Sequence, residues 1–294
     1  MISYNPKDWF TFIFRFHKAD TFRTLFPMII AICIYTAIVA WFETDYVHLT
    51  ENSRVKNISI MHTMLTFVIS MLLVFRTNTA YERWWEGRKL WGALVNNSRN
   101  LAIKINALLP EELNEEKNFF ATMIANYAFV LKDHLRNSLH PEELEENNFF
   151  KTTELKSEQH NPNYIAKQIF NRLETLKRSN RITQEEMLYL NAEVSSFTDV
   201  CGACERIKNT PIPYSYSAFL KKFIFFFIMS LPLSMVLSMG YAAVPVVAFI
   251  FYVLTSLELI AEEIEDPFGK DANDLPTDQI SKNIRKSVHE IFGV

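Results

Sequence analysis

Residues 58–91 read ISIMHTMLTFVISMLLVFRTNTAYERWWEGRKLW, and the interpretation of the chain starts from this stretch. Its first 18 residues carry no formal charge, whereas the next 16 contain six charged side chains interleaved with aromatic ones. Because no proline or glycine occurs before Gly87, the pattern predicts one long helix. The apolar half is long enough to lie in a bilayer, and the charged half must contact water. We therefore predict a helix that passes from lipid into water.

Four apolar windows of 17 or 18 residues divide the chain. They predict transmembrane helices, each just long enough to cross roughly 30 Å of hydrocarbon. Between the second and third windows lies a polar block, 76–222, rich in Glu, Asn and Lys. Alternating strand patterns are absent from the sequence. We therefore predict an all-α membrane protein with a large helical cytosolic region. The predicted spans are 25–42, 58–75, 223–239 and 241–257.

The segments outside the spans predict the orientation of the chain. Residues 1–24 mix aromatic and basic side chains, which predicts an amphipathic segment at the headgroup level or, alternatively, a plain cytoplasmic tail. Residues 258–294 predict an acidic segment followed by a helix. Basic residues are frequent before the first span and after the second, whereas the connection 43–57 holds only Arg54 and Lys56. The positive-inside rule therefore places both termini and the polar block in the cytoplasm.

Helix signals also divide the polar block. Thr183 and Glu186 have the spacing of a capping box, which predicts the start of a helix. Pro232 lies inside the third span and is expected to kink it. The helices expected outside the spans cover 96–109, 111–139, 164–178, 183–208 and 278–291.

Charge and motifs exclude several classes of protein. A net charge of −3 without a Lys/Arg cluster argues against a nucleic-acid partner. The sequence has no P-loop, no G-x-S-x-G and no H-E-x-x-H, so it gives no sign of an enzyme. Cys201 and Cys204 form a C-x-x-C that is either half of a zinc site or a buried thiol pair on a helix. No second C-x-x-C or H-x-x-H accompanies it.

Three bulky side chains repeat along the second span. Phe67, Met71 and Phe75 are spaced i, i+4, i+8, which places them on one face of a helix. One interpretation is helix packing or lipid contact. The other is a hydrophobic constriction, in which several copies of the chain surround a pore with rings of these side chains and gate it by dewetting. Phe ring edges carry partial positive charge, so such a neck would tolerate anions.

The acidic segment after the fourth span allows a cation site. Asp271 and Asp274, with nearby backbone carbonyls, could bind calcium, which takes several oxygen ligands. The D-x-D-x-D spacing of an EF-hand is missing, so a solvated acidic turn or a helix cap is the alternative. No other cofactor is indicated by the sequence.

Three segments together resemble the bestrophin family in its bacterial branch. The segments are LVFRTNTAYERWWEGRKLWG at 73–92, CERIKNTPIPYSYS at 204–217 and EEIEDPFGKDANDLP at 262–276. They occur in the same order as in that family, and the spans between them follow the family's pattern. Bestrophins are pentameric ion channels, and animal members are chloride channels. The resemblance implies that the second span of each subunit lines a narrow hydrophobic neck at Phe67, Met71 and Phe75.

The resemblance also implies roles for residues beyond the neck. A cytosolic aperture would fall at Glu185 or its neighbour, where five carboxylates would attract cations. The alternative is that Glu185 only stabilises the start of its helix through the helix dipole. Arg83 and Trp84 are expected to hold the helix bundle together below the neck. Asp271 and Asp274 match the side-chain positions of the family's calcium clasp, whereas Lys270 and Ala272 depart from its acidic cluster.

We therefore predict a passive homopentameric ion channel in the bacterial inner membrane. Its partners are copies of itself, the lipid bilayer and monovalent ions. The family implies conduction of chloride or other anions. Because a ring of Glu185 carboxylates would attract cations, conduction of monovalent cations is the alternative. Two alternatives are a carrier for a small organic solute, with Pro232 breaking one span, and a non-conducting membrane scaffold.

Overall fold

The computed structural model describes residues 21–48 and 58–294. Within these ranges the regular structure is helical, apart from one isolated bridge in a loop. The predicted amphipathic segment 1–24 lies almost entirely outside the described residues, and so does most of the connection 43–57.

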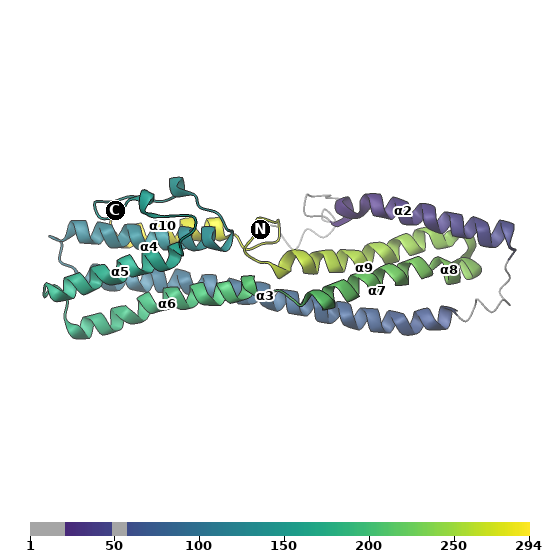
Figure 1. Ribbon diagram of the computed structural model, residues 1–294, viewed down its shortest axis with the longest axis horizontal. Coiled ribbons are helices and arrows are strands. Elements are labelled where there is room, and N and C mark those ends of the chain that lie inside the picture. Colours follow the sequence, from purple (N-terminus) through teal and green to yellow (C-terminus); the bar gives the residue numbers. More distant parts are fainter. Residues whose placement is uncertain (1–20, 49–57) are drawn as a thin grey trace. The chain divides into compact units, whose positions relative to one another are not determined.

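Two compact units make up the described chain (Figure 1). Helix α3, Ile58–Leu108, contributes to both units, which divide between Arg83 and Trp84. Beyond its part of α3, the first unit contains α2 and the segments Pro211–Glu265 and Asp271–Asn273. The second unit is formed by Trp84–Thr210, Asp266–Lys270 and Asp274–Val294.

The long helix predicted from the sequence is present as α3, which runs for 51 residues without a break. It continues through Gly87 and Gly92 and ends at Leu108. Pro110 explains this end, because proline disfavours helical geometry in the residue that precedes it. One uninterrupted helix thus carries the apolar and the charged half of the stretch 58–91.

Besides α3, the described residues of the first unit form four α-helices. Three stretches of the described chain are long and apolar enough to cross a membrane, by length and composition alone, and they are Thr21–Tyr46, Ser59–Leu108 and Tyr214–Glu265. The third stretch contains both the third and the fourth predicted span. The chain turns back at Gly240 between these two spans, so they are two separate crossings. The helices concerned are α2 (Thr21–Trp41, followed by a π-helical turn at Phe42–Tyr46), α7 (Tyr214–Ser230), α8 (Pro232–Met239) and α9 (Ala243–Glu265).

Two residues shape the hairpin between these last helices. Pro232 interrupts the helix, so that α7 ends at Ser230 and α8 begins at Pro232, as the sequence predicts. Gly240 adopts a φ of 55°, in the left-handed region that glycine enters without steric cost. The chain then turns through a short 3₁₀ segment into α9, which packs against α7, α8 and α2 (Figure 1).

Several polar side chains inside the first unit form hydrogen bonds with one another. His62 on α3 is buried and contacts the hydroxyl groups of Ser230 and Ser234 through its Nε2 and Nδ1, at 2.9 and 3.1 Å. Thr21 donates to the hydroxyl of Ser256 at 2.9 Å. Such pairing is required where no water can satisfy a polar group. The apolar core around these contacts consists of Ile69, Leu73, Leu220, Ile224, Phe227, Ile228, Leu231 and Val247.

Arg76 is the most deeply buried charge on α3, with 1% of its side chain exposed. Its Nε lies 3.4 Å from Glu258 Oε2, and its Nη1 lies 2.7 Å from Glu265 Oε2. Both carboxylates belong to α9, one near its middle and one at its end. A buried guanidinium is tolerated only when carboxylates neutralise it, so these ion pairs fix α3 against α9.

Glu265 joins further segments of the first unit. Its Oε1 accepts a hydrogen bond from the backbone N–H of Ile212 at 2.8 Å, just before α7. Its carbonyl oxygen accepts a hydrogen bond from Arg83 Nε at 3.0 Å. Arg83 and Arg76 are seven residues apart, or about two turns of α3, so the helix is held to the end of α9 at two levels.

The second unit is built around α4 (Asn114–Leu135), which is buried on all sides from Phe119 to Asp133. The helix that the sequence predicts over 111–139 is present with shorter bounds, but the extent of its burial was not predicted. Small and apolar residues cover the whole circumference of α4, so its neighbours can enclose it. These neighbours are the second half of α3, α5 (Asn161–Arg178), α6 (Gln184–Asn209) and α10 (Thr277–Phe292) (Figure 1).

Two glycines permit close packing in the second unit. A Cβ atom added at Gly87 would lie 3.2 Å from the ring of Phe268, which is a tight contact. A Cβ atom added at Gly269 would lie 2.6 Å from Asp274 Oδ2, a distance that real Cβ atoms do not tolerate. Arg136 Nε donates to the carbonyl oxygen of Phe268 at 3.0 Å. The segment after α9 therefore folds tightly onto Gly87 of α3.

The capping box predicted at the start of α6 is confirmed. The backbone N–H of Glu186 donates to Thr183 Oγ1 at 3.2 Å, and the backbone N–H of Thr183 donates to Glu186 Oε2 at 2.7 Å. These two bonds satisfy N–H groups that have no partner within the helix.

We predict that replacing Arg76 destabilises the first unit strongly. In the variant Arg76→Met, Glu258 and Glu265 lose the cation that neutralises them, and removing one partner of a buried ion pair costs about 3–5 kcal/mol. Unfolding of the full chain in detergent, by heat or denaturant, measures this loss.

The control for this prediction is Arg178→Met, because Arg178 pairs with Glu174 while 78% of its side chain is exposed. A change of at most about 0.5 kcal/mol is expected there. Adding Glu258→Gln to Arg76→Met should recover part of the stability, since one orphaned charge is removed. Equal stability of Arg76→Met and the wild type would contradict the role of the ion pairs.

Candidate functional site

The buried positions of α3 form a single stripe in the first unit. They are His62, Ile69, Leu73, Arg76 and Ala80, each at most 5% exposed. Intervals of seven, four, three and four residues keep these side chains on one side of an α-helix. This side packs against α7 and α9, through the apolar core and the ion pairs of Arg76.

The three predicted neck residues lie on the opposite side of α3. Phe67, Met71 and Phe75 are exposed by 72%, 51% and 54%. Each is two residues from Ile69 or Leu73, and two residues correspond to about 200° around an α-helix. Because the buried stripe packs against the other helices of the first unit, all three side chains point away from these helices.

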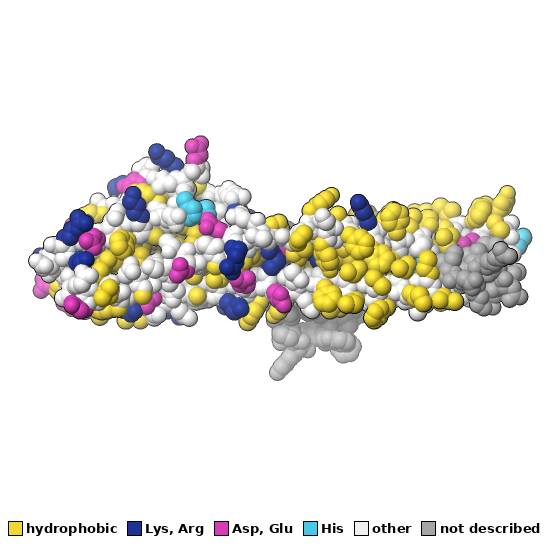
Figure 2. Space-filling view, turned by 60° about the horizontal axis from the view of Figure 1, so that its bottom comes forward, with side chains coloured by type: hydrophobic (Ala, Val, Ile, Leu, Met, Phe, Trp, Pro, Cys, Tyr) yellow, Lys and Arg dark blue, Asp and Glu magenta, His cyan; other side chains and the backbone are white. Residues whose placement is uncertain are grey.

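The outward side of α3 is mostly apolar beyond these three positions, and the exposed hydroxyl groups of Thr63 and Ser70 on it donate to backbone carbonyls of the same helix. Ile60 and Met64 continue it toward the start of the helix, with 60% and 69% of their surface exposed. Figure 2 shows that, on the face drawn, hydrophobic side chains gather over the first unit, whereas Lys, Arg, Asp and Glu are scattered over the second. Exposed apolar surface of this extent has to be covered by lipid or by other protein.

Glu185, predicted at the cytosolic aperture, is exposed in the first turn of α6. The capping hydrogen bonds of that turn are made by Thr183 and Glu186. Among the described residues, the side chain of Glu185 forms no hydrogen bond or ion pair. Its carboxylate is therefore not used by the cap, although it lies where the helix dipole stabilises a negative charge.

Arg83 and Trp84 occupy neighbouring positions on α3. Arg83 donates to the carbonyl oxygen of Glu265, as described above. Trp84 is partly buried and packs against the apolar core of the second unit. Their expected role below the neck stays a prediction.

The two aspartates predicted to bind calcium differ in their surroundings. Asp271 is exposed, whereas Asp274 is buried, with its Oδ2 beside Gly269. Neither belongs to a group of three or more His, Cys, Asp or Glu side chains that converge within 4.8 Å, as far as the described residues extend. Side chains alone therefore do not assemble a calcium clasp at this segment, and calcium binding stays a prediction.

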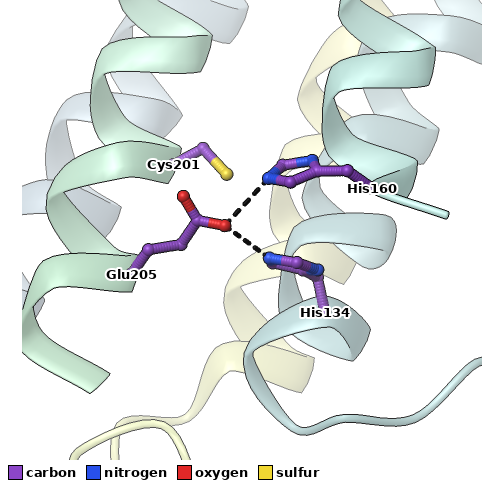
Figure 3. Close-up of side chains that lie close together, drawn as sticks. All are labelled: His134, His160, Cys201 and Glu205. Atoms are coloured by element: carbon purple, nitrogen blue, oxygen red, sulfur yellow. Dashed lines mark hydrogen bonds and ion pairs between the residues drawn. The ribbon is translucent and has the colours of Figure 1, made fainter. Parts of the chain in front are cut away.

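The structure also gathers residues that the sequence patterns do not connect. His134, His160 and Glu205 lie together with Cys201 in the second unit (Figure 3). Cys201 and Cys204 are both buried free thiols, as one of the two interpretations of the C-x-x-C expects. The two histidines lie 71 and 45 residues before Glu205, so no short motif could have identified this group.

Comparison with known proteins gives a consistent result. Residues 1–290 match the family model described as Bacterial/Fungal Bestrophin protein. A voltage-dependent anion channel-forming protein of Synechocystis sp. is 37% identical over 234 residues, which cover 77% of this chain and 75% of that protein. The voltage-dependent anion channel-forming protein YneE of Escherichia coli is 29% identical over 287 residues, which cover 97% and 91%.

Solved structures agree with this result. The crystal structure of a bacterial bestrophin homologue from Klebsiella pneumoniae matches this structure with a TM-score of 0.78 at 25% sequence identity. The match covers 90% of this chain and 99% of that one. The chain described here therefore belongs to the bestrophin family, in its bacterial and fungal branch.

Proposed function

We propose that this protein is a passive anion channel, in which α3 helices from several copies of the chain surround a pore. The observation that carries the proposal is the rotation of α3, whose buried stripe turns Phe67, Met71 and Phe75 away from the chain that holds them. The names of its relatives as voltage-dependent anion channel-forming proteins favour anions as the permeant ions.

The exposed apolar face of α3 has to be covered, and other copies of the chain are the cover that we propose. We propose a homopentamer in the bacterial inner membrane, with both termini in the cytoplasm. The pentamer rests on the family resemblance, and the orientation rests on the distribution of Lys and Arg. An interface between copies removes apolar surface from lipid and water, and the cyclic arrangement repeats the same face of α3 around one axis.

In such an assembly the neck would act as a hydrophobic gate. Rings of Phe67, Met71 and Phe75 would present no hydrogen-bonding group to a hydrated ion. A narrow apolar constriction loses its water, and an ion then meets a barrier that widening removes. The edges of the two phenylalanine rings carry partial positive charge, which favours anions over cations once the neck is open.

We predict that Phe75→Ala increases the ion current of the reconstituted protein several-fold. The substitution widens one ring of the neck and allows water to enter it. The measurement is the current across planar bilayers that contain purified wild type or variant at equal protein density.

Phe249→Ala is the matched control, because Phe249 is 65% exposed on α9 and lies outside the proposed neck. Its current should equal that of the wild type. The proposal fails if neither the wild type nor Phe75→Ala conducts ions, or if both substitutions change the current equally.

We further propose that Glu185 faces the cytosolic end of the ion pathway. Its exposed carboxylate is not used by the capping box, so five copies could form a ring of negative charge. Such a ring lowers the local concentration of anions and raises that of cations. The neck and this ring would then act on selectivity in opposite directions.

Glu185→Ala should therefore shift the reversal potential under a salt gradient toward the equilibrium potential of the anion. The comparison is Glu158→Ala, which removes an exposed carboxylate outside α6 and changes the net charge equally. An unchanged reversal potential in Glu185→Ala would contradict a role of this residue in selectivity. Its carboxylate would then only stabilise the start of α6 through the helix dipole.

A further inference from the structure

Four side chains from three helical elements converge in the second unit (Figure 3). His134 lies in the last turn of α4, and His160 is the residue that caps the start of α5. Cys201 and Glu205 lie one turn apart on α6, and therefore on the same face of that helix. The potential ligand atoms of all four residues lie within 4.8 Å of one another.

We propose that His134, His160, Glu205 and Cys201 form a binding site for a divalent transition-metal ion such as zinc. The site lies outside the proposed pore neck and is independent of whether the chain conducts anions. It would fasten α4, α5 and α6 to one another.

The geometry around Glu205 supports this proposal. His134 Nε2 lies 2.6 Å and His160 Nε2 lies 2.8 Å from the same carboxylate atom, Glu205 Oε1. The two imidazole rings lie side by side, with their centres 4.4 Å apart. Two ring nitrogens that aim at one point from different helices form an arrangement that a single cation can replace or bridge.

The donor set matches zinc in its chemistry. Zinc takes nitrogen from His, sulfur from Cys and oxygen from carboxylates, usually four ligands in a tetrahedron. Two imidazoles, one carboxylate and one thiol provide four donors of these types. Calcium and magnesium prefer oxygen ligands throughout, so this set does not suit them.

Burial gives the cluster a closed inner side and an open outer side. Cys201 is 1% exposed. The side chains of His134, His160 and Glu205 keep 28%, 35% and 29% of their surface exposed, so an ion can reach them from solvent.

The protonation states of the metal-free protein determine which protons must leave. Burial raises the pKa of the Cys201 thiol to about 12, so it is neutral without a metal. Burial also acts to raise the pKa of Glu205, but the hydrogen bonds from His134 and His160 outweigh it and lower that pKa. The carboxylate is therefore ready as a ligand, whereas coordination by the thiol releases a proton to solvent.

His160 requires a change of tautomer. Its Nδ1 accepts a hydrogen bond from the backbone N–H of Asn163 at 3.2 Å, so the neutral ring carries its proton on Nε2. Coordination through Nε2 moves this proton to Nδ1 and removes the bond from Asn163. The loss is one long, neutral hydrogen bond, which is small beside a metal–ligand bond.

A second cluster in the same unit provides a contrast. Asp133, His140 and Glu143 also converge, but Lys132 lies among their carboxylates. Lys132 Nζ is 3.6 Å from Asp133 Oδ1 and forms an ion pair with Glu143. An ammonium group already neutralises this cluster, so we expect no metal there.

Metal binding to the full-length protein in detergent tests the proposal. The protein is first freed of metal with a chelator and then titrated with zinc, and separately with cobalt as a spectroscopic probe. We expect one equivalent of zinc per chain, a rise of the unfolding temperature with zinc concentration, and a visible cobalt spectrum of tetrahedral type with a sulfur charge-transfer band.

Three variants separate the site from other binding. His134→Gln combined with His160→Gln should weaken zinc binding by about tenfold or more. Cys201→Ser should remove the sulfur band of cobalt while keeping weaker binding, and it provides an independent test if the double variant does not fold. His140→Gln, in the contrasting cluster, should bind zinc like the wild type.

The proposal is overturned by either of two results. One is a wild-type protein that takes up no zinc in the titration. The other is zinc binding that stays equal in the folded double variant and in the wild type, or that is lost only in His140→Gln.

Discussion

The ion pairs of Arg76 with Glu258 and Glu265 determine how α3 is turned in the first unit. A guanidinium with 1% of its side chain exposed has to point at carboxylates, and both of these belong to α9. Once Arg76 points at α9, Ile69 and Leu73 face the same core, because they lie on the same side of the helix. Phe67, Met71 and Phe75 then have to face outward. The electrostatic requirement of one residue thus decides which side of α3 is free to meet other copies of the chain.

This arrangement separates two tasks along one helix. The inner side of α3 holds the fold of the first unit, with apolar contacts, the hydroxyl partners of His62 and the ion pairs of Arg76. The outer side consists mostly of exposed, bulky apolar side chains. A surface of this kind is costly in a monomer, and assembly around an axis turns it into a constriction. Membership of the bestrophin family agrees with this division, since its bacterial relatives carry names of anion channel-forming proteins.

Local sequence signals predicted a large part of the fold. The break at Pro232 and the capping box of Thr183 and Glu186 depend on neighbouring residues, and the structure confirms both. The continuous course of α3 follows equally from its composition. The complete burial of α4 was not predicted, because it depends on four other helices that surround it rather than on its own periodicity.

The candidate sites were less accessible to sequence reasoning. Spacing places Phe67, Met71 and Phe75 on one face but does not distinguish helix packing from a pore neck. The burial of Ile69 and Leu73 was needed to show that this face points outward. Arg76 and Glu258 are 182 residues apart, so no local pattern could pair them. The same holds for the two histidines beside Glu205, which come from separate helices.

The most direct test of the central claim places a thiol on the outward side of α3. In Met71→Cys, a charged, membrane-impermeant thiol reagent applied during a bilayer recording should reduce the current irreversibly. The wild type controls for the native cysteines at 33, 201 and 204. We expect block in Met71→Cys and none in the wild type or in Ile34→Cys, which places a thiol on the exposed surface of α2. A full, unchanged current in Met71→Cys after demonstrated labelling of the thiol would contradict the proposed neck.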